Sequence, residues 1–431
     1  MGTAIVVGGG IAGLFAVRVL RDHFDEVVLV ERDDFSQSPV PRTGVPQAAH
    51  VHGLLTRGLQ IAERLLPGVA EELRGLGAVD VDMGADVAIR NAFGWSTRFP
   101  SQVRTLSMTR GLFEWVVRQR VIDNVPVVRG RVDGLLGASD RVTGVRIGDR
   151  ELRADLVVDA SGRASTAPRR LSGLGIVPPE EKVVDAHLGY ATRVYRIPDS
   201  HSADWRVLYV QLGAGQTRGG LLCPIEGGRW QLTLCGLGDD RPPTDEEGFT
   251  RFAKGLVAPD IAEAVAAAQP LTGVVGTRAT SNRRRYFERR PVRGFVVLGD
   301  ALCSFNPVYG QGMTMGLLGS DLLGECLRAG ELGDFQARLG ALTNVPWDMA
   351  THADARFPGT EGLSLRRRHR LMAAYVDRLV LAGNSDPVVQ EEFLHVVGLL
   401  RPATRLLLPG VVARVIRTCV SSRRRGADGG D

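Results

Sequence analysis

Short apolar runs and stretches with helical spacing alternate at the start of the chain. Residues 4–7 form a branched apolar run, which predicts a buried strand. The apolar residues at 14, 15, 17, 19 and 20 predict a helix, and residues 26–31 predict a second strand that ends in Glu31. The chain therefore begins with a predicted βαβ unit.

The same patterns predict further elements in the first part of the chain. A Pro-rich loop follows Glu31, and helices are predicted from about His52 to Leu76 and over 112–121. Predicted strands cover 86–98 as a pair, 127–145 as two strands around Gly134, and 156–162 as one buried strand.

The pattern changes between residues 185 and 240, where strands are predicted at 207–212, 220–224 and 229–235 with a hairpin turn at 226–229. A helix is predicted over 249–268 and a buried strand over 294–300, and the region from 317 onward is mainly helical. We expect an α/β fold with a Rossmann-type domain at 1–85, 105–172 and 286–330. An antiparallel-sheet substrate domain would cover 86–104 and 173–285, and a C-terminal helical region 331–431.

Glycines with dinucleotide-binding spacing follow the first predicted strand. In Gly8-x-Gly10-x-x-Gly13, Gly8 allows a tight turn, Gly10 lets the backbone approach a pyrophosphate, and Gly13 lets helix and strand pack closely. Glu31, about 20 residues further on, can accept a ribose hydroxyl. The helix N-terminus offers free N–H groups to phosphate. We therefore predict dinucleotide binding.

A second cofactor element is predicted at residues 299–313. Asp300 follows a buried strand, where it can bond a ribityl hydroxyl, and Pro307 interrupts the chain before Gly310 and Gly312. The helix that resumes at Met313 can direct its positive end at the pyrimidine edge of a flavin, where negative charge develops on reduction.

Composition excludes several classes of protein. The 431 residues are 44% apolar and 23% charged, as in ordinary globular proteins, with a net charge of +5. Arginine runs at 283–285, 366–368 and 423–425 are scattered and are interpreted as solvated faces, so no nucleic-acid partner is expected. No run of 18 apolar residues predicts a transmembrane segment, and five separated cysteines predict neither a metal site nor a disulfide framework. We expect a reduced, cytoplasmic protein.

Together these motifs resemble the FAD-dependent monooxygenases of the p-hydroxybenzoate hydroxylase type. Three longer segments, at 42–52, 159–165 and 303–313, are similar to bacterial enzymes related to squalene epoxidase, including the epoxidases of polyether polyketide pathways. The resemblance implies a glutathione-reductase-like FAD-binding fold. At 159–162 the chain has Asp-Ala-Ser-Gly instead of the Asp-Gly-x-x-Ser of many hydroxylases. Direct binding of NADPH is therefore in question, and NAD(P)H visiting transiently or a partner flavin reductase would supply electrons.

The resemblance also implies roles for individual residues. Those expected to bind FAD are Gly8, Gly10, Gly13, Glu31, Arg32, Arg42, Arg110, Val132, Asp159, Asp300, Pro307, Gly310, Gly312 and Met313. Apart from the resemblance, three aromatic residues are candidates for lining an apolar pocket, and with the two histidines of the 42–52 segment they make up the expected substrate pocket: His50, His52, Tyr209, Trp230 and Phe305. No metal ligand set and no catalytic side chain is assigned.

The expected activity is epoxidation or hydroxylation of an apolar polyketide- or terpene-like intermediate, free or carrier-bound, through a flavin C4a-hydroperoxide. The absence of an acid–base dyad fits this chemistry, because the cofactor supplies the oxidant. Four alternatives remain open: a non-redox [4+2] cyclase with structural FAD, a halogenase, a prenyl reductase and a pure binding module. The halogenase resembles the chain less, because the Trp-x-Trp-x-Ile-Pro segment is absent.

Overall fold

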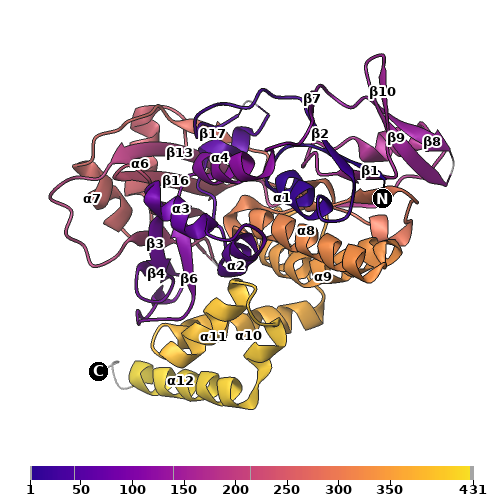
Figure 1. Cartoon of the computed structure of the whole chain (residues 1–431). Coiled ribbons are helices and arrows are strands. Elements are labelled where there is room, and N and C mark those ends of the chain that lie inside the picture. Colours follow the sequence, from indigo (N-terminus) through magenta and orange to yellow (C-terminus); the bar gives the residue numbers. More distant parts are fainter. Residues whose placement is uncertain (1, 43, 139, 214, 428–431) are drawn as a thin grey trace.

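A five-stranded parallel sheet lies at the centre of the first part of the molecule (Figure 1). The computed structural model describes residues 2–42, 44–138, 140–213 and 215–427. In the order found across the sheet, the strands are β19 (Phe295–Val297), β11 (Leu156–Asp159), β1 (Thr3–Val7), β2 (Glu26–Glu31) and β7 (Val127–Arg129). The predicted βαβ unit is confirmed, because β1 and β2 are parallel neighbours joined through α1 (Ile11–Leu20).

Helices cover this sheet and share one large hydrophobic core with it. Helix α8 (Gly312–Ala329) lies against α1, and its small residues allow the close approach: a Cβ on Gly316 would lie 3.1 Å from the Ala12 Cβ. The other helices of this part are α2 (Thr56–Leu65), α3 (Val69–Gly75), α4 (Arg110–Val121), α5 (Ala167–Ser172) and α9 (Phe335–Asp354).

A seven-stranded sheet forms the second layer, to the left of the parallel sheet in Figure 1. Its strands, in spatial order, are β17 (Val275–Thr277), β13 (Leu188–Arg196), β16 (Arg229–Leu237), β15 (Arg218–Ile225), β14 (Val207–Val210), β4 (Val87–Asn91) and β5 (Gly94–Trp95). Helices α6 (Glu246–Lys254) and α7 (Asp260–Ala266) pack on one face. The opposite face contributes to the cavity described below.

Smaller sheets complete the strand inventory of the described residues. They are β8 (Gly134–Ala138), β9 (Arg141–Ile147) and β10 (Arg150–Arg153); β12 (Glu181–Val184), β18 (Asn282–Arg285) and β20 (Cys303–Ser304); and β3 (Val79–Asp82) with β6 (Arg104–Ser107). Short 3-10 turns occur at Pro46–Ala49, Phe287–Arg289, Gly299–Ala301, Pro307–Tyr309, Leu332–Asp334 and Ala403–Leu407.

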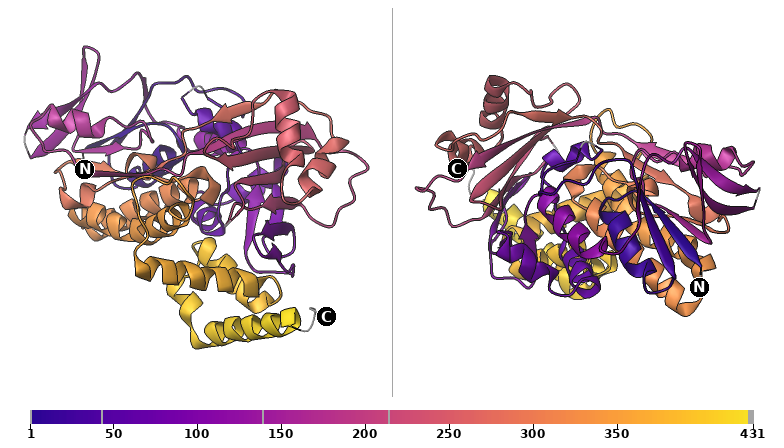
Figure 2. Two further views of the ribbon diagram at one scale, coloured as in Figure 1. Left: turned by 180° about the vertical axis from the view of Figure 1, so that it is seen from behind. Right: turned by 45° about the horizontal axis from the view of Figure 1, so that its top comes forward.

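The last three helices, α10 (Arg367–Gly383), α11 (Pro387–Val397) and α12 (Pro409–Ala427), form a unit with its own hydrophobic cluster. Figure 2 shows this yellow unit beside both the α8–α9 layer and the strands near β4. Asn384 joins it to the sheet, because its Oδ1 accepts a hydrogen bond of 2.7 Å from Asn91 Nδ2. None of the helices in the described part of the chain is both long and apolar enough to cross a membrane.

The structure corrects four sequence predictions. The sheet expected to be antiparallel is mixed, because β14 pairs with β4 in parallel. The region 127–145 gives three strands, of which β7 joins the parallel sheet. The helix predicted over 249–268 is split into α6 and α7 around Pro259. The arginine run at 283–285 lies in β18, with Arg284 and Arg285 only 2% and 3% exposed, because Glu288 and Glu181 neutralise them.

The run at 366–368 is exposed as predicted, and the side chains of 423–425 lie outside the described residues. The domain boundaries given above stay a prediction.

Candidate functional site

One continuous cavity of about 920 Å³ runs from the carboxyl ends of β1 and β2 to the face of the seven-stranded sheet. It lies outside the strand ends of an open α/β sheet, where ligands of such folds bind. Every residue predicted for the cofactor or substrate lines it, except Gly13, Asp159 and Trp230.

The glycines after β1 form the narrow end of this cavity. Gly8 has a φ of +103°, which a side chain would strain. A Cβ on Gly13 would lie 1.8 Å from the Gly8 carbonyl oxygen, so α1 and the β1 turn touch only because residue 13 is glycine. At Gly10, in contrast, the nearest atom to a Cβ would be Arg110 Nη2 at 3.9 Å. The space over Gly10 therefore belongs to the cavity.

Glu31 ends β2 as a buried carboxylate. Its Oε2 accepts a hydrogen bond of 2.6 Å from the Gly9 N–H, and its Oε1 accepts bonds from the N–H groups of Arg32 and Asp33. Burial raises the pKa of Glu31, but Arg42 and the N–H groups of Asp33 and Gly9 outweigh burial and hold it below its ordinary value. Glu31 also lines the cavity, so a ribose hydroxyl can approach this carboxylate.

Arg42 connects β2 with α4 at the narrow end of the cavity. Its guanidinium lies 3.1 Å from Glu31 Oε2 and donates a 2.6 Å hydrogen bond to Glu114 Oε1 on α4. Arg110, at the start of the same helix, is 3.5 Å from the second oxygen of Glu114. Glu114 thereby holds two arginines at the cavity. Among the residues that the structure describes, none accepts a hydrogen bond from the buried Nε of Arg110. These cations suit the phosphates of a dinucleotide.

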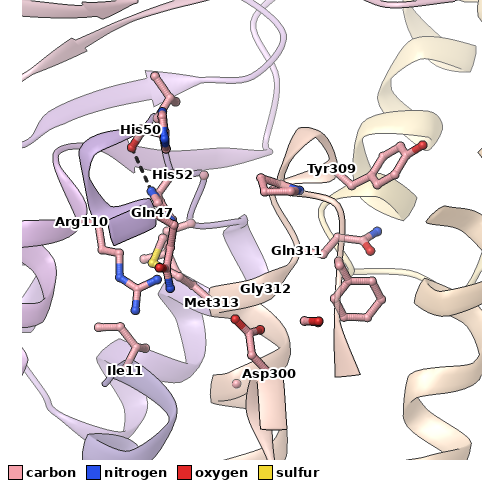
Figure 3. A pocket seen from close by; sticks show the side chains of 18 of the residues that line it. Ile11, Gln47, His50, His52, Arg110, Asp300, Tyr309, Gln311, Gly312 and Met313 are labelled. Atoms are coloured by element: carbon pink, nitrogen blue, oxygen red, sulfur yellow. Dashed lines mark hydrogen bonds between the residues drawn. The ribbon is translucent and has the colours of Figure 1, made fainter. Parts of the chain in front are cut away.

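The segment from Gly299 to Met313 forms the opposite wall, and Figure 3 shows Asp300 and Gly312 facing Arg110 across the cavity. Within the described chain, no group donates a hydrogen bond to the Asp300 carboxylate, so its oxygens remain available. Burial raises the pKa of Asp300, and the charges of Arg110 and Arg163 act in the opposite direction. A ligand that donates hydroxyl groups would satisfy this carboxylate.

The two predicted histidines lie at the junction between the cavity's ends. His50 Nδ1 is 2.8 Å from Thr192 Oγ1, which fastens the loop to β13. His52 Nδ1 lies 2.9 Å from the His50 carbonyl oxygen (Figure 3). Since a carbonyl only accepts, Nδ1 carries the proton and Nε2 is an acceptor. Burial, with the positive charge of Arg110, lowers the pKa of His52 to about 3, so the ring is neutral.

Beyond the histidines the cavity becomes apolar. Tyr209 and Phe305, two of the residues proposed for the substrate, line it. Residues there that the sequence did not indicate include Val81, Met83, Ile89, Leu221, Phe393 and Val397. Phe393 and Val397 belong to α11, and no sequence pattern relates this helix to the earlier segments that form the rest of the cavity. The spacing of apolar residues in a helix shows which face of the helix is apolar, but it does not show which other element or cavity that face packs against.

Three predicted residues lie elsewhere. Gly13 acts through packing, as described. Asp159 is 1% exposed, and its carboxylate accepts hydrogen bonds of 2.5 Å from the hydroxyls of Ser161 and Ser165, so it shapes the turn after β11. Trp230 is a correction: it is buried on the other face of β16, stacked with Trp205 against α6 and α7, because neighbouring strand residues point to opposite faces.

Comparison with known proteins agrees with this geometry. A family model described as "FAD binding domain" matches residues 2–330. The chain is 35% identical to "Protein Rv3254" of Mycobacterium tuberculosis, over 92% of this chain and 89% of that protein. It is 25% identical to squalene epoxidase 2, mitochondrial, of Arabidopsis thaliana, over 75% of this chain and 53% of that protein. The structure of the flavin-dependent brominase Bmp2 superposes with a TM-score of 0.70 at 15% identity, covering 98% of this chain and 99% of that one.

The fold is the mixed α/β FAD-binding fold typical of the p-hydroxybenzoate hydroxylase type. The chain belongs to the FAD binding domain family and is an FAD-dependent oxidoreductase. The site fits this cofactor, because Gly10 and Gly312 leave room at the cavity wall, and because no described residue hydrogen-bonds to Arg110 Nε or to the Asp300 carboxylate. Its volume is also within the range of cofactor pockets.

Proposed function

We propose that this protein is an FAD-dependent monooxygenase that epoxidises or hydroxylates an apolar, polyketide- or terpene-like intermediate of secondary metabolism. One observation carries the proposal: the cofactor cradle opens without interruption into an apolar chamber between the seven-stranded sheet and α11. A squalene epoxidase among the relatives supports the same class of reaction on an apolar substrate.

In this proposal FAD is held by those of the residues predicted for the cofactor that line the cavity. Gly8 and Gly10 give the pyrophosphate access to the α1 N-terminus, and Arg42 and Arg110 offset its charge. Glu31 and Asp300 accept hydroxyl groups of the ribose and the ribityl chain. Further contacts are proposed for Arg32, Val132, Pro307, Gly310, Gly312 and Met313.

Reduced FAD would supply the activated oxygen, and the surrounding residues orient the substrate and exclude water. His52, neutral and with Nε2 as an acceptor, can receive a hydrogen bond from a substrate hydroxyl. The apolar side chains of β4, β15 and α11 would hold a hydrocarbon segment beside the flavin. Electrons would come from NAD(P)H binding transiently or from a partner reductase, and the substrate could be free or attached to a carrier.

The test is oxygen incorporation. The FAD-loaded enzyme is reduced anaerobically and mixed with ¹⁸O₂-saturated buffer and a panel of linear polyenes and terpenes. We expect one labelled oxygen atom in the product, detected by mass spectrometry, and a transient flavin absorption that substrate prolongs. A product of unchanged mass, formed without oxygen or reductant, would instead assign the protein as a cyclase with structural FAD.

Phe393→Ala tests whether the apolar chamber holds the substrate. Because the variant enlarges the chamber without touching the cofactor end, we expect KM to rise for the preferred substrate while FAD affinity is unchanged. Val388→Ala is the matched control, since Val388 is on the same helix but 46% exposed. Equal effects of the two variants on KM would contradict the assignment of the chamber.

A further inference from the structure

A buried carboxylate at the end of α9 contacts the segment Asn306–Tyr309, which precedes α8 and lines the cavity. Asp354 is completely buried, and its carboxylate accepts hydrogen bonds from three side chains: Tyr309 Oη at 2.5 Å, Asn282 Nδ2 at 2.6 Å and Asn306 Nδ2 at 3.2 Å. Asn282 and Asn306 are themselves 0% and 1% exposed. Segments from β18, from the loop after β20 and from α9 therefore converge on one acidic group.

The orientation of both asparagines is fixed by backbone donors. The Asn306 N–H donates to Asn282 Oδ1 at 2.8 Å, and the Val308 N–H donates to Asn306 Oδ1 at 3.3 Å. Tyr190, which lines the cavity, also donates its hydroxyl to Asn306 Oδ1 at 2.6 Å. Since each amide oxygen is occupied as an acceptor, each NH₂ group must face Asp354.

Asp354 therefore faces only donors. A carboxylate can accept all three hydrogen bonds, whereas an asparagine at 354 would direct its own NH₂ group at one of them. The pKa of Asp354 lies above its ordinary value, because burial and the charge of Asp185 raise it by more than the hydrogen bonds from Tyr309, Asn306 and Asn282 lower it. Losing a partner in such a buried network costs more than losing one at the surface.

The groups that Asp354 holds belong to the wall of the cofactor cavity. Asn306 precedes the turn Pro307–Tyr309, and Tyr309 is the last residue of that turn. Gly310 then adopts a φ of +63°, and α8 begins at Gly312. A Cβ on Gly312 would lie 3.6 Å from Asp300 Oδ1, so the turn, the α8 N-terminus and Asp300 form one surface. In Figure 3 the Tyr309 ring points away from Asp300, toward the C-terminal helices.

We propose that Asp354 is a positioning residue for the flavin: through Tyr309 and Asn306 it fixes the Pro307–Gly312 turn, and with it the α8 N-terminus, against the cofactor. Asp354 lies outside residues 2–330, so the C-terminal part of the chain takes part in the cofactor site. The inference rests on the proposed binding of FAD at this turn and does not depend on which substrate is oxygenated.

The test compares FAD binding and the flavin reduction potential in Asp354→Asn, in Tyr309→Phe and in a control. The control is Asp348→Asn, the same change at an exposed position of the same helix. In Asp354→Asn we expect the Kd of FAD, measured by fluorescence titration of the apoprotein, to rise by about tenfold. One of the three buried donors loses its carboxylate acceptor in this variant, so the Pro307–Gly312 turn is held less firmly against the cofactor.

The reduction potential separates positioning from general stability. The positive end of α8 favours the reduced flavin more than the oxidised one, so a displaced turn weakens binding of the reduced form most. A tenfold preferential loss lowers the potential of this two-electron couple by about 30 mV. Dye-equilibrated reduction should show this fall in Asp354→Asn and a smaller one in Tyr309→Phe, with non-additive effects in the double variant.

Two results would overturn the proposal. One is an Asp354→Asn protein that has the same FAD affinity and flavin reduction potential as Asp348→Asn. This result would overturn the proposal even if Asp354→Asn unfolds at a lower urea concentration. The other, decisive if Asp354→Asn does not fold, is a folded Tyr309→Phe protein with an unchanged potential. An enzyme that binds FAD but transfers no oxygen would refute the proposed function alone, because both readouts here concern the cofactor without substrate.

Discussion

Two glycines of the N-terminal motif should respond to the same substitution in different ways. A methyl group on Gly13 would lie 1.8 Å from the Gly8 carbonyl oxygen and 3.4 Å from the Ala160 Cβ. Backbone atoms cannot rotate away, so α1 must move by more than an ångström relative to the turn after β1. For Gly13→Ala we expect a loss of roughly 1–3 kcal/mol or more in the free energy of unfolding, the usual range for overpacking.

Gly10→Ala should spare the fold and impair the cofactor. The φ of Gly10 is −80°, which alanine adopts without strain, and its Cβ would meet only Arg110 Nη2 at 3.9 Å. The stability of the apoprotein should stay within about 1 kcal/mol of wild type. The methyl group would, however, occupy space where the pyrophosphate approaches, so FAD should bind tenfold to a hundredfold more weakly, about 1.4–2.8 kcal/mol.

The assay is urea unfolding of each apoprotein together with FAD fluorescence titration. Gly75→Ala is the matched control, because Gly75 ends α3 on the surface and a Cβ there would meet nothing within 4 Å. It should be neutral or slightly stabilising and bind FAD normally. A Gly10→Ala apoprotein that is destabilised as much as Gly13→Ala, or that binds FAD like wild type, would contradict these different roles of the two glycines.

Three further predictions concern charge and pH. The pKa of Glu31 is lowered in the folded state, so its stabilising contribution is present above its ordinary value of 4.5 and is lost as pH falls through the folded value. The urea stability of the apoprotein should therefore fall more steeply below pH 4.5 in wild type than in Glu31→Gln, and parallel curves would contradict this. Because the pKa of His52 is about 3, its imidazole NMR signals should not shift between about pH 5 and 8; a titration there would show that the ring is not buried beside Arg110. Asp82→Asn should lower the free energy of unfolding by about 1–3 kcal/mol, since the Asp82 carboxylate accepts hydrogen bonds from the Ser101 hydroxyl and from backbone N–H groups; unchanged urea unfolding would refute it.

Features that depend on short-range geometry can be predicted from the residues that form them. The glycine spacing at 8–13, the strand that ends in Glu31 and the turn at 299–313 each lie within a few residues of the structure they specify. Steric limits on φ, buried-strand composition and helix termini act over that range. These segments therefore predicted both the βαβ unit and the walls of the cavity.

Which face of a strand meets the cavity depends on the elements that pack against the strand. Trp230 and Gln231 are both buried neighbours in β16, but only Gln231 lines the cavity, because α6 and α7 cover the face to which Trp230 points. The strand alternates Trp230, Leu232 and Leu234 with Gln231, Thr233 and Cys235, which separates its two faces. Only the packing of α6 and α7 on the first set decides that the second set lines the cavity.

Long-range contacts likewise came only from the fold. The pairing of β4 with β14, the placement of Phe393 over the apolar chamber and the burial of Asp354 behind the Pro307–Gly312 turn each join segments at least 45 residues apart, the separation of Asp354 from Tyr309. The chain pays the closure entropy of such contacts through packing of the whole core, so no local pattern encodes them.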